Sequence, residues 1–230
     1  GCHYDSELFS AVCKKYSVPT LCLHHGWPAL IHTRFINMGY DYYITWGRHF
    51  VNLWKIYNPC IKFIDAGYLG EISTNTKSKS GIAFFFQGPL FIIDEKLIKL
   101  MADFAIHCAT KYSNRIIYIR QHPEFRLSRT IINTMVQLPN IQFVDNLKIS
   151  ELFSYSLIGV GVFSTTLIEG LAHDTIPFIF NITSWPNYYP DLNKLQQGIE
   201  VKCIEEAQNK IDKLINNEDG VTDSIQSNIK

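Results

Sequence analysis

From residue 81 onward, short apolar runs of strand length alternate with segments of helical periodicity. The apolar runs predict five strands, at 82–86, 116–119, 141–144, 157–160 and 178–180. The periodic segments predict helices at 95–111, about 128–137, 150–153, after residue 164 and about 204–216. Strands and helices that alternate in this way indicate an α/β domain with a parallel sheet wound on both faces.

The first part of the chain repeats this alternation more loosely, with a helix expected at 5–16 and strands expected at 21–23, 42–46 and 62–65. A polar segment at 71–80, whose only large apolar side chain is Ile72, separates the two regions. We therefore expect two Rossmann-like domains, divided as 1–70, a linker at 71–80, and 81–220. Because the chain begins with Gly1 rather than Met, the first domain is expected to lack its amino-terminal part.

The turn after the strand expected at 157–160 is the most informative segment. Ser164, Thr165 and Thr166 place three hydroxyl groups where a helix begins, and a helix start also offers unpaired N–H groups. Glu169 follows one turn later, where its carboxylate could accept hydrogen bonds from a ribose. This combination is typical of a nucleotide site, although Ser or Thr at such a position is also the ordinary N-cap of a helix.

Two other strand ends carry groups that could bind an anion. His122 follows a strand, and Pro123 stops the chain from continuing in the ladder. Arg120 stands two residues earlier, so it is expected to point to the same face as His122. Gln87 ends the first strand of the second domain, and its amide could reach a ligand. The alternatives are a surface histidine for His122 and a plain turn at Gln87.

His24 and His25 end the strand expected at 21–23 and precede Gly26. An imidazole there could act as a general base, because its unperturbed pKa of roughly 6.5 suits proton abstraction near neutrality. Adjacent strand residues point to opposite faces, so one histidine at most faces a cleft, and His25 is the better candidate. The alternative is a pair of histidines with no chemical role. An aromatic segment at 185–191 is expected to cover a bound nucleotide or to pack as a lid.

Composition narrows the possible classes of protein. Hydrophobic residues make up 47% of the chain and charged residues 18%, which is a globular composition. The 21 basic and 21 acidic residues give a net charge of zero, which argues against broad binding to nucleic acid. The six cysteines form no Cys-x-x-Cys pair, so no zinc knuckle or redox motif is indicated. Dehydrogenase, P-loop and α/β-hydrolase fingerprints are also absent.

The order of these motifs resembles glycosyltransferases of the GT-B type, which have two Rossmann-like domains. The resemblance rests on His25-Gly26, His122-Pro123 and the turn Ser164–Thr166 with Glu169. More narrowly, it is similar to bacterial capsule and lipopolysaccharide transferases that use CMP-activated sugars such as Kdo or sialic acid. In that family a His-Pro motif and a Ser/Thr pair hold the CMP phosphate. The acidic motif that supplies the base in many sialyltransferases is matched only weakly in this sequence, by Asp65–Gly67.

The resemblance implies that a sugar moves from a nucleotide-activated donor, with a CMP-sugar favoured, to a bacterial surface polysaccharide. Residues 1–70 would then form the acceptor side, and 81–220 would bind the nucleotide sugar. His25 would be the catalytic residue, and the donor-binding residues would be Gln87, Arg120, His122, Ser164, Thr165, Thr166 and Glu169. No metal is implied, and no cofactor beyond the nucleotide sugar as co-substrate.

The implied partners are the nucleotide-sugar donor and a glycan or glycolipid acceptor, with no nucleic acid. The implied location is the cytoplasm, with peripheral association at the inner membrane. Two alternatives stay open at this point. CDP-glycerol glycerophosphotransferases share a His-Gly loop and a His-Pro corner, and in such an enzyme His25 would deprotonate an incoming hydroxyl. The other alternative is a non-catalytic GT-B-like binding module.

Overall fold

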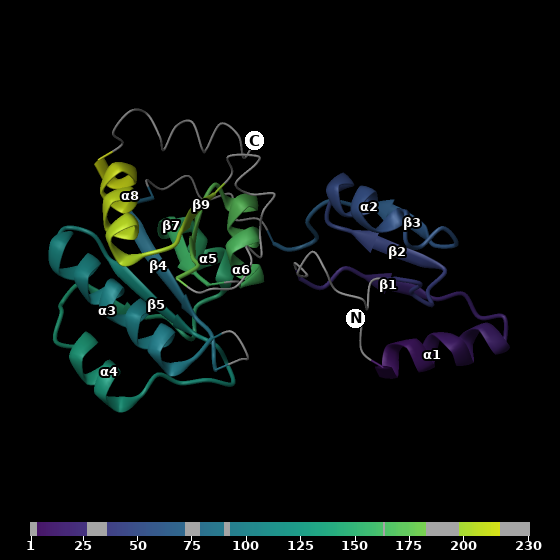
Figure 1. Ribbon diagram of the computed structural model, residues 1–230, viewed down its shortest axis with the longest axis horizontal. Helices are drawn as coiled ribbons and strands as arrows, with labels where there is room; N and C mark the ends of the chain where they lie inside the picture. The colour runs from purple at the N-terminus through teal and green to yellow at the C-terminus, as the bar shows by residue number, and fades with distance from the viewer. Residues whose placement is uncertain are drawn as a thin grey trace. The chain divides into compact units, whose positions relative to one another are not determined.

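The computed structural model describes residues 4–26, 36–71, 79–89, 93–162, 164–182 and 198–216 (Figure 1). The chain forms two compact units, Gly1–Glu71 and Ile72–Lys230, because most contacts between residues fall within one or the other. Most of the expected linker lies outside the described residues, so its extent stays a prediction. The aromatic segment at 185–191 also lies outside them.

The first unit contains a parallel sheet with the strand order β1-β2-β3. Its described elements are α1 (Tyr4–Lys15), β1 (Leu21–Leu23), β2 (Tyr42–Thr45), α2 (Arg48–Lys55) and β3 (Lys62–Asp65). The three strands and α1 agree with the sequence-based expectation to within a residue or so at each end. Helix α2 was missed because it has only eight residues and buries only two of them, Phe50 and Trp54.

His24 belongs to the core of the first unit. Its ring centroid lies 4.4 Å from that of Phe50, 4.8 Å from that of Trp46 and 5.1 Å from that of Trp54. The backbone N–H of Trp46 donates to Nδ1 at 3.3 Å, while Nε2 is buried and has no hydrogen-bond partner among the described residues. Burial lowers the pKa of the His24 imidazole to about 4, so the ring is neutral at physiological pH.

The second unit is built on a six-stranded sheet with the order β6-β5-β4-β7-β8-β9, in which every pair of neighbours is parallel. Its strands are β4 (Gly81–Phe86), β5 (Ile117–Gln121), β6 (Ile141–Phe143), β7 (Ser156–Gly161), β8 (Ile176–Phe180) and β9 (Ile199–Val201). Its described helices are α3 (Glu95–Lys111), α4 (Arg129–Met135), α5 (Ile149–Tyr155), α6 (Thr165–Glu169), the 3-10 helix η2 (Gly170–His173) and α8 (Ile204–Asn216). The expectation of five strands was wrong, because β9 adds a sixth that is three residues long and buries only Val201.

Helices cover both faces of this sheet, as the side chains of β4 show. All six residues of β4 are buried. Phe84 meets Phe104 of α3, with ring centroids 5.9 Å apart, and the next residue, Phe85, meets Phe153 of α5 at 5.8 Å. Because adjacent strand residues point to opposite faces, α3 and α5 must lie on opposite sides of the sheet. The expectation of a doubly wound α/β unit is confirmed.

Burial of His24 predicts that the first unit loses stability in acid. Below pH 6.5 the unfolded chain binds a proton at His24, whereas the folded unit binds it only near pH 4. The unfolded state therefore holds more protons between these values, and the free energy of unfolding falls as the pH falls from 6.5 toward 4. Over the whole interval the loss from this one group is about 3 kcal/mol, of which about 2 kcal/mol falls between pH 6.5 and pH 5. Urea unfolding followed by tryptophan fluorescence at pH 7.5 and pH 5 measures this second, smaller loss.

The control for this prediction compares the two neighbouring histidines. His24→Phe keeps an aromatic side chain in the core and removes the titrating group, so its pH dependence should be flatter than that of the parent protein. His25→Phe changes an exposed histidine and should keep the parent's pH dependence. Equal pH dependence in the parent and in His24→Phe would contradict the assignment.

Candidate functional site

The carboxyl ends of β5, β4 and β7 lie side by side, because β4 pairs with both of the other two strands. The sheet order reverses between β4 and β7, since β5 and β6 follow on one side and β7, β8 and β9 on the other. Doubly wound sheets bind ligands outside the strand ends at such a reversal. Gln87, His122 and Ser164 are the polar residues that follow these three strands.

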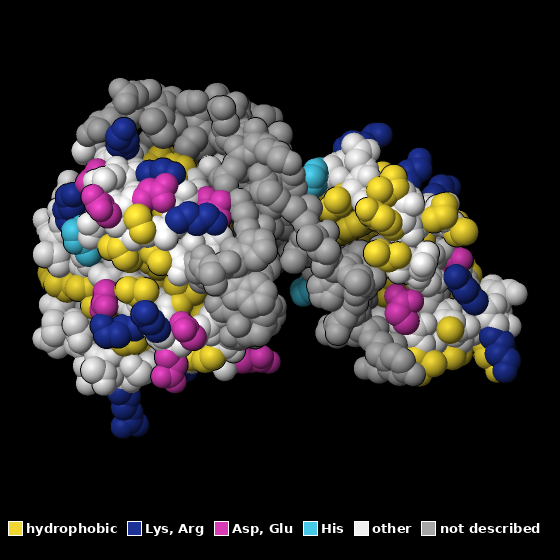
Figure 2. All heavy atoms as spheres, in the orientation of Figure 1, with side chains coloured by type: hydrophobic (Ala, Val, Ile, Leu, Met, Phe, Trp, Pro, Cys, Tyr) yellow, Lys and Arg dark blue, Asp and Glu magenta, His cyan; other side chains and the backbone are white. Residues whose placement is uncertain are grey.

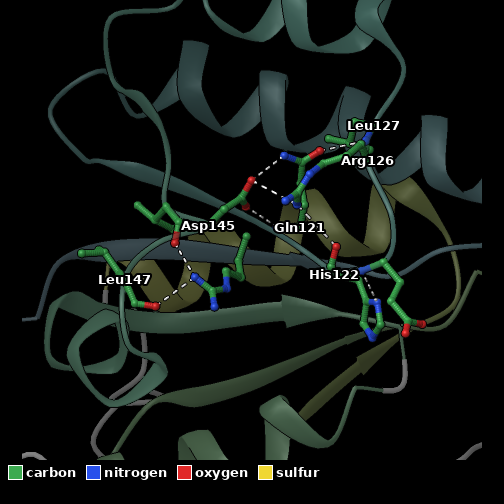
Figure 3. A network of polar contacts seen from close by, with 9 residues as sticks. Gln121, His122, Arg126, Leu127, Asp145 and Leu147 are labelled. Atoms are coloured by element: carbon green, nitrogen blue, oxygen red, sulfur yellow. Dashed lines mark hydrogen bonds and ion pairs between the residues drawn. The ribbon is translucent and has the colours of Figure 1, made fainter.

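His122 begins an exposed corner at the end of β5 (Figure 3). Its backbone N–H donates to the carbonyl of Phe86 at 3.0 Å, which fastens the corner to β4. The backbone N–H of Glu124 donates to Nδ1 of the ring at 3.2 Å. Because Nδ1 accepts this bond, the neutral ring carries its proton on Nε2. His122 therefore presents an N–H donor at the edge of the sheet.

Gln121 and Asp145 form a network behind this corner that the sequence patterns did not reveal (Figure 3). The backbone N–H of Gln121 donates to Oδ1 of Asp145 at 2.9 Å, and its side-chain Nε2 donates to Oδ2 at 2.8 Å. Oε1 of Gln121 accepts the N–H of Leu127 at 2.8 Å. Arg126 adds an ion pair to Asp145 at 3.3 Å. In the sequence, the only indication of a role for Asp145 was its position just after β6, the strand that pairs with β5.

Arg120 makes contacts that fix the backbone beside this network. One terminal guanidinium nitrogen, Nη1, donates to the carbonyl of Val144 at 2.6 Å and to that of Leu147 at 2.9 Å. No hydrogen bond links Arg120 to His122 within the described residues. The contacts observed are structural, and a role for Arg120 in binding the donor stays a prediction.

Ser164 is the N-cap of α6, since its Oγ accepts the backbone N–H of Thr166 at 3.3 Å. The cap uses a lone pair of Oγ and leaves the hydroxyl proton available. Thr165, Thr166 and Glu169 are half-buried, while Leu167 and Ile168 of the same helix are buried against the sheet. The ordinary capping role of this turn is therefore present, and a ligand-binding role stays a prediction.

His25 lies in the first unit, after β1, and its side chain is exposed. Gly26 follows with a φ of 86°, a value that favours glycine and allows the chain to turn there. The two histidines point in opposite senses, as the strand periodicity predicts, with His24 in the core. The structure thus brings Gln87, His122 and the Ser164 turn to one sheet edge of the second unit and places His25 in the other unit.

Charges of both signs are mixed on the face of the second unit seen in Figure 2, and this unit also contains ion pairs. Lys111 contacts Asp212 at 2.6 Å, and Lys210 contacts Glu206 at 2.8 Å. Within the described ranges, no group of three His, Cys, Asp or Glu side chains is arranged to hold a metal ion. Among the described helices, none combines the length and apolar character needed to cross a bilayer.

The fold is that of the GT-B type, in which two Rossmann-like units follow one another in the chain. The pneumococcal O-GlcNAc transferase GtfA, solved with UDP and GlcNAc, has a similar fold with a TM-score of 0.61 and 13% sequence identity, covering 97% of this chain and 50% of GtfA. The wall teichoic acid polymerase TagF gives a TM-score of 0.58 at 15% identity, covering 94% of this chain and 62% of TagF.

The S. aureus protein MnaA, solved with UDP, gives a TM-score of 0.62 at 9% identity, covering 94% of this chain and 64% of MnaA. The chain thus spans only 50 to 64% of the lengths of these three proteins. No family model matches the sequence, and no curated protein matches it. At such low identity the shared feature is the fold.

Proposed function

We propose that this chain binds a nucleotide-activated donor in its second unit and belongs to an enzyme that transfers a sugar. The observation that carries the proposal is the position of Gln87, His122 and Ser164 at three adjacent strand ends, where the sheet order reverses. The GT-B fold shared with GtfA, which was solved with UDP and GlcNAc, supports it.

In this proposal the Nε2–H of His122 donates to a phosphate oxygen of the donor. The hydroxyl groups of Ser164, Thr165 and Thr166 add donors from the neighbouring strand end, and Glu169 accepts from the ribose. Negative charge grows on the departing phosphate in the transition state, so donors fixed in place before the reaction stabilise it more than the ground state. Gln87 and Arg120 complete the donor site.

The donor favoured by the sequence resemblance is a CMP-sugar, and the acceptor is a glycan or glycolipid of a bacterial surface polysaccharide. The second candidate is a CDP-glycerol-type glycerophosphotransferase, which the structural likeness to the teichoic acid polymerase TagF favours. In both cases His25 is the general base, and the reaction uses neither a metal nor a further cofactor. The proposed location is the cytoplasm, with peripheral association at the cytoplasmic face of the inner membrane.

The first test is a thermal-shift panel with CMP, CDP, UDP, GDP and dTDP. A ligand that binds only the folded state raises the free energy of unfolding by about 2.7 kcal/mol at a hundredfold excess over Kd. We expect a clear rise in melting temperature with at least one cytidine nucleotide. A shift with UDP alone would move the donor class away from CMP, and no shift with any of the five at millimolar concentration would overturn the proposal.

The second test is His122→Ala, which removes the proposed phosphate donor at an exposed position. Loss of a hydrogen bond to a charged group costs about 1.5 to 3 kcal/mol, so nucleotide affinity should fall roughly ten- to a hundredfold. Calorimetric titration measures this change, and a melting curve checks that the fold is intact. Glu124→Ala is the matched control, because it alters an exposed side chain two residues away and keeps the backbone N–H that contacts His122. Equal affinity in His122→Ala and Glu124→Ala would count against the role of His122.

The third test distinguishes the proposed role of the first unit in catalysis from that of the second unit in nucleotide binding. His25→Ala should lower turnover by about 10² to 10⁴, the usual worth of general base catalysis, while nucleotide affinity stays within twofold of the parent. Turnover is measured on the whole protein with an acceptor and with an activated donor that carries the nucleotide identified by the panel. Near-normal turnover would remove His25 as the base. Loss of nucleotide binding as severe as in His122→Ala would instead make His25 a donor ligand.

A further inference from the structure

We propose that Asp145 and Gln121 are positioning residues for His122, and that they act by holding the loop from 121 to 127 in the shape that orients the imidazole. The value of that orientation for ligand binding rests on the proposed function. The orientation itself is a property of the folded chain and is testable without any ligand.

In the first step, Asp145 holds Gln121, the residue just before His122, through hydrogen bonds. Both oxygens of the carboxylate are used, one on the backbone N–H of Gln121 and the other on its side-chain amide. A residue held at its backbone and at its side chain by one carboxylate has little freedom to rotate. Because His122 is the next residue along the chain, its backbone direction is fixed from the same point.

The second step closes the loop that contains His122. Oε1 of Gln121 accepts the N–H of Leu127, so one side chain joins the two ends of the loop. Inside the loop, Phe125 donates its N–H to the carbonyl of His122 at 3.0 Å. The loop also packs closely on the end of β4, since a Cβ at Gly88 would lie 3.1 Å from the Cβ of Phe125. Only a glycine allows this approach without displacing Phe125.

The third step fixes Asp145 itself. Arg120 donates from Nη1 to the carbonyls of Val144 and Leu147, which stand on either side of Asp145 in the chain. The N–H of Val144 in turn donates to the carbonyl of Ile119 at 2.9 Å. The segment after β6 is therefore attached to the end of β5 at several points, and the carboxylate of Asp145 is held facing Gln121.

The last step reaches the ring. The Glu124 N–H that contacts Nδ1 of His122 belongs to the same closed loop, two residues after the histidine. Its position depends on the loop's shape, which depends on Gln121 and Asp145. The network thus sets both the direction of the ring and the nitrogen that carries the proton. It leaves Nε2–H as a donor that points away from the loop's own hydrogen bonds (Figure 3).

The test uses Asp145→Asn, which keeps the size of the side chain and one acceptor for Gln121. In place of Oδ2 the new NH₂ group faces two donors, Nε2 of Gln121 and the guanidinium of Arg126, and in place of Oδ1 it faces the backbone N–H of Gln121. In either orientation one of the hydrogen bonds to Gln121 is lost. The matched control is Asp103→Asn on α3, an exposed carboxylate paired with Lys99 at 2.6 Å. Gln121→Met serves as a second variant should Asp145→Asn not fold, because it keeps the backbone N–H and loses both side-chain bonds.

The first readout is the ¹⁵N spectrum of the His122 imidazole, recorded without ligand at a pH where the ring is neutral and assigned with His122→Ala. In the parent protein and in Asp103→Asn, we expect one set of signals with the proton on Nε2. In Asp145→Asn, or in Gln121→Met, the Nδ1 signal should move as the bond from Glu124 is lost. Coincident imidazole spectra in the parent and the variant would overturn the positioning role.

The second readout is nucleotide affinity in a double-mutant cycle. Asp145→Asn should weaken binding about tenfold in the parent and less than twofold in a protein that already carries His122→Ala, because Asp145 acts through His122. Losses of equal size in both backgrounds would mean that Asp145 acts independently, and the proposal fails. If the parent protein binds no nucleotide, the proposed function fails, and the imidazole spectrum alone decides the positioning role.

Discussion

The burial of β4 on both faces is the constraint on which the second unit depends. The strand has a paired neighbour on each side, and Phe84 and Phe85 pack against helices on opposite faces. A strand in this position cannot be reached by a hairpin, so each connection to a parallel neighbour must be a crossover with a helix. Those crossovers bring the carboxyl ends of all the strands to one edge. The candidate site is at that edge because the core is built around β4.

The same constraint explains why the sequence predicts most of this unit. Strands that are buried on both faces read as continuous apolar runs, and the runs at 82–86, 157–160 and 178–180 fall within β4, β7 and β8. The expected helix 95–111 coincides with α3, whose N-cap Asp94 accepts the N–H of Leu97 at 2.7 Å. The misses were α2 and β9, which are short and bury few side chains. For such elements the tertiary contacts decide the structure, and no local pattern is strong enough to indicate it.

The residues of the candidate site also divide into those that the sequence predicts and those that only tertiary contacts reveal. Residues at the ends of apolar runs are visible in the sequence, so Gln87, His122 and Ser164 were predicted together. The partner of Gln121 was not visible, because Asp145 is 24 residues away and meets it only when β5 and β6 pair. The contacts of Arg120 are with backbone carbonyls, which carry no sequence signal. Strand periodicity predicted that His24 and His25 face opposite ways, but the aromatic rings that bury His24 come from a later segment.

The polar groups at the sheet edge are of two kinds, which differ in whether all their observed hydrogen bonds serve to fix the chain. Asp145, Gln121 and Arg120 direct hydrogen bonds to groups of the chain itself, and they fix the shape of the edge. His122 accepts a hydrogen bond from the chain at Nδ1, so its neutral ring carries the proton on Nε2. The fold is shared with proteins of 9 to 15% identity, so it places such an edge without deciding what binds there. What binds at this edge is therefore decided by its side chains, and among the described residues His122 is a side chain whose orientation depends on the network around Asp145.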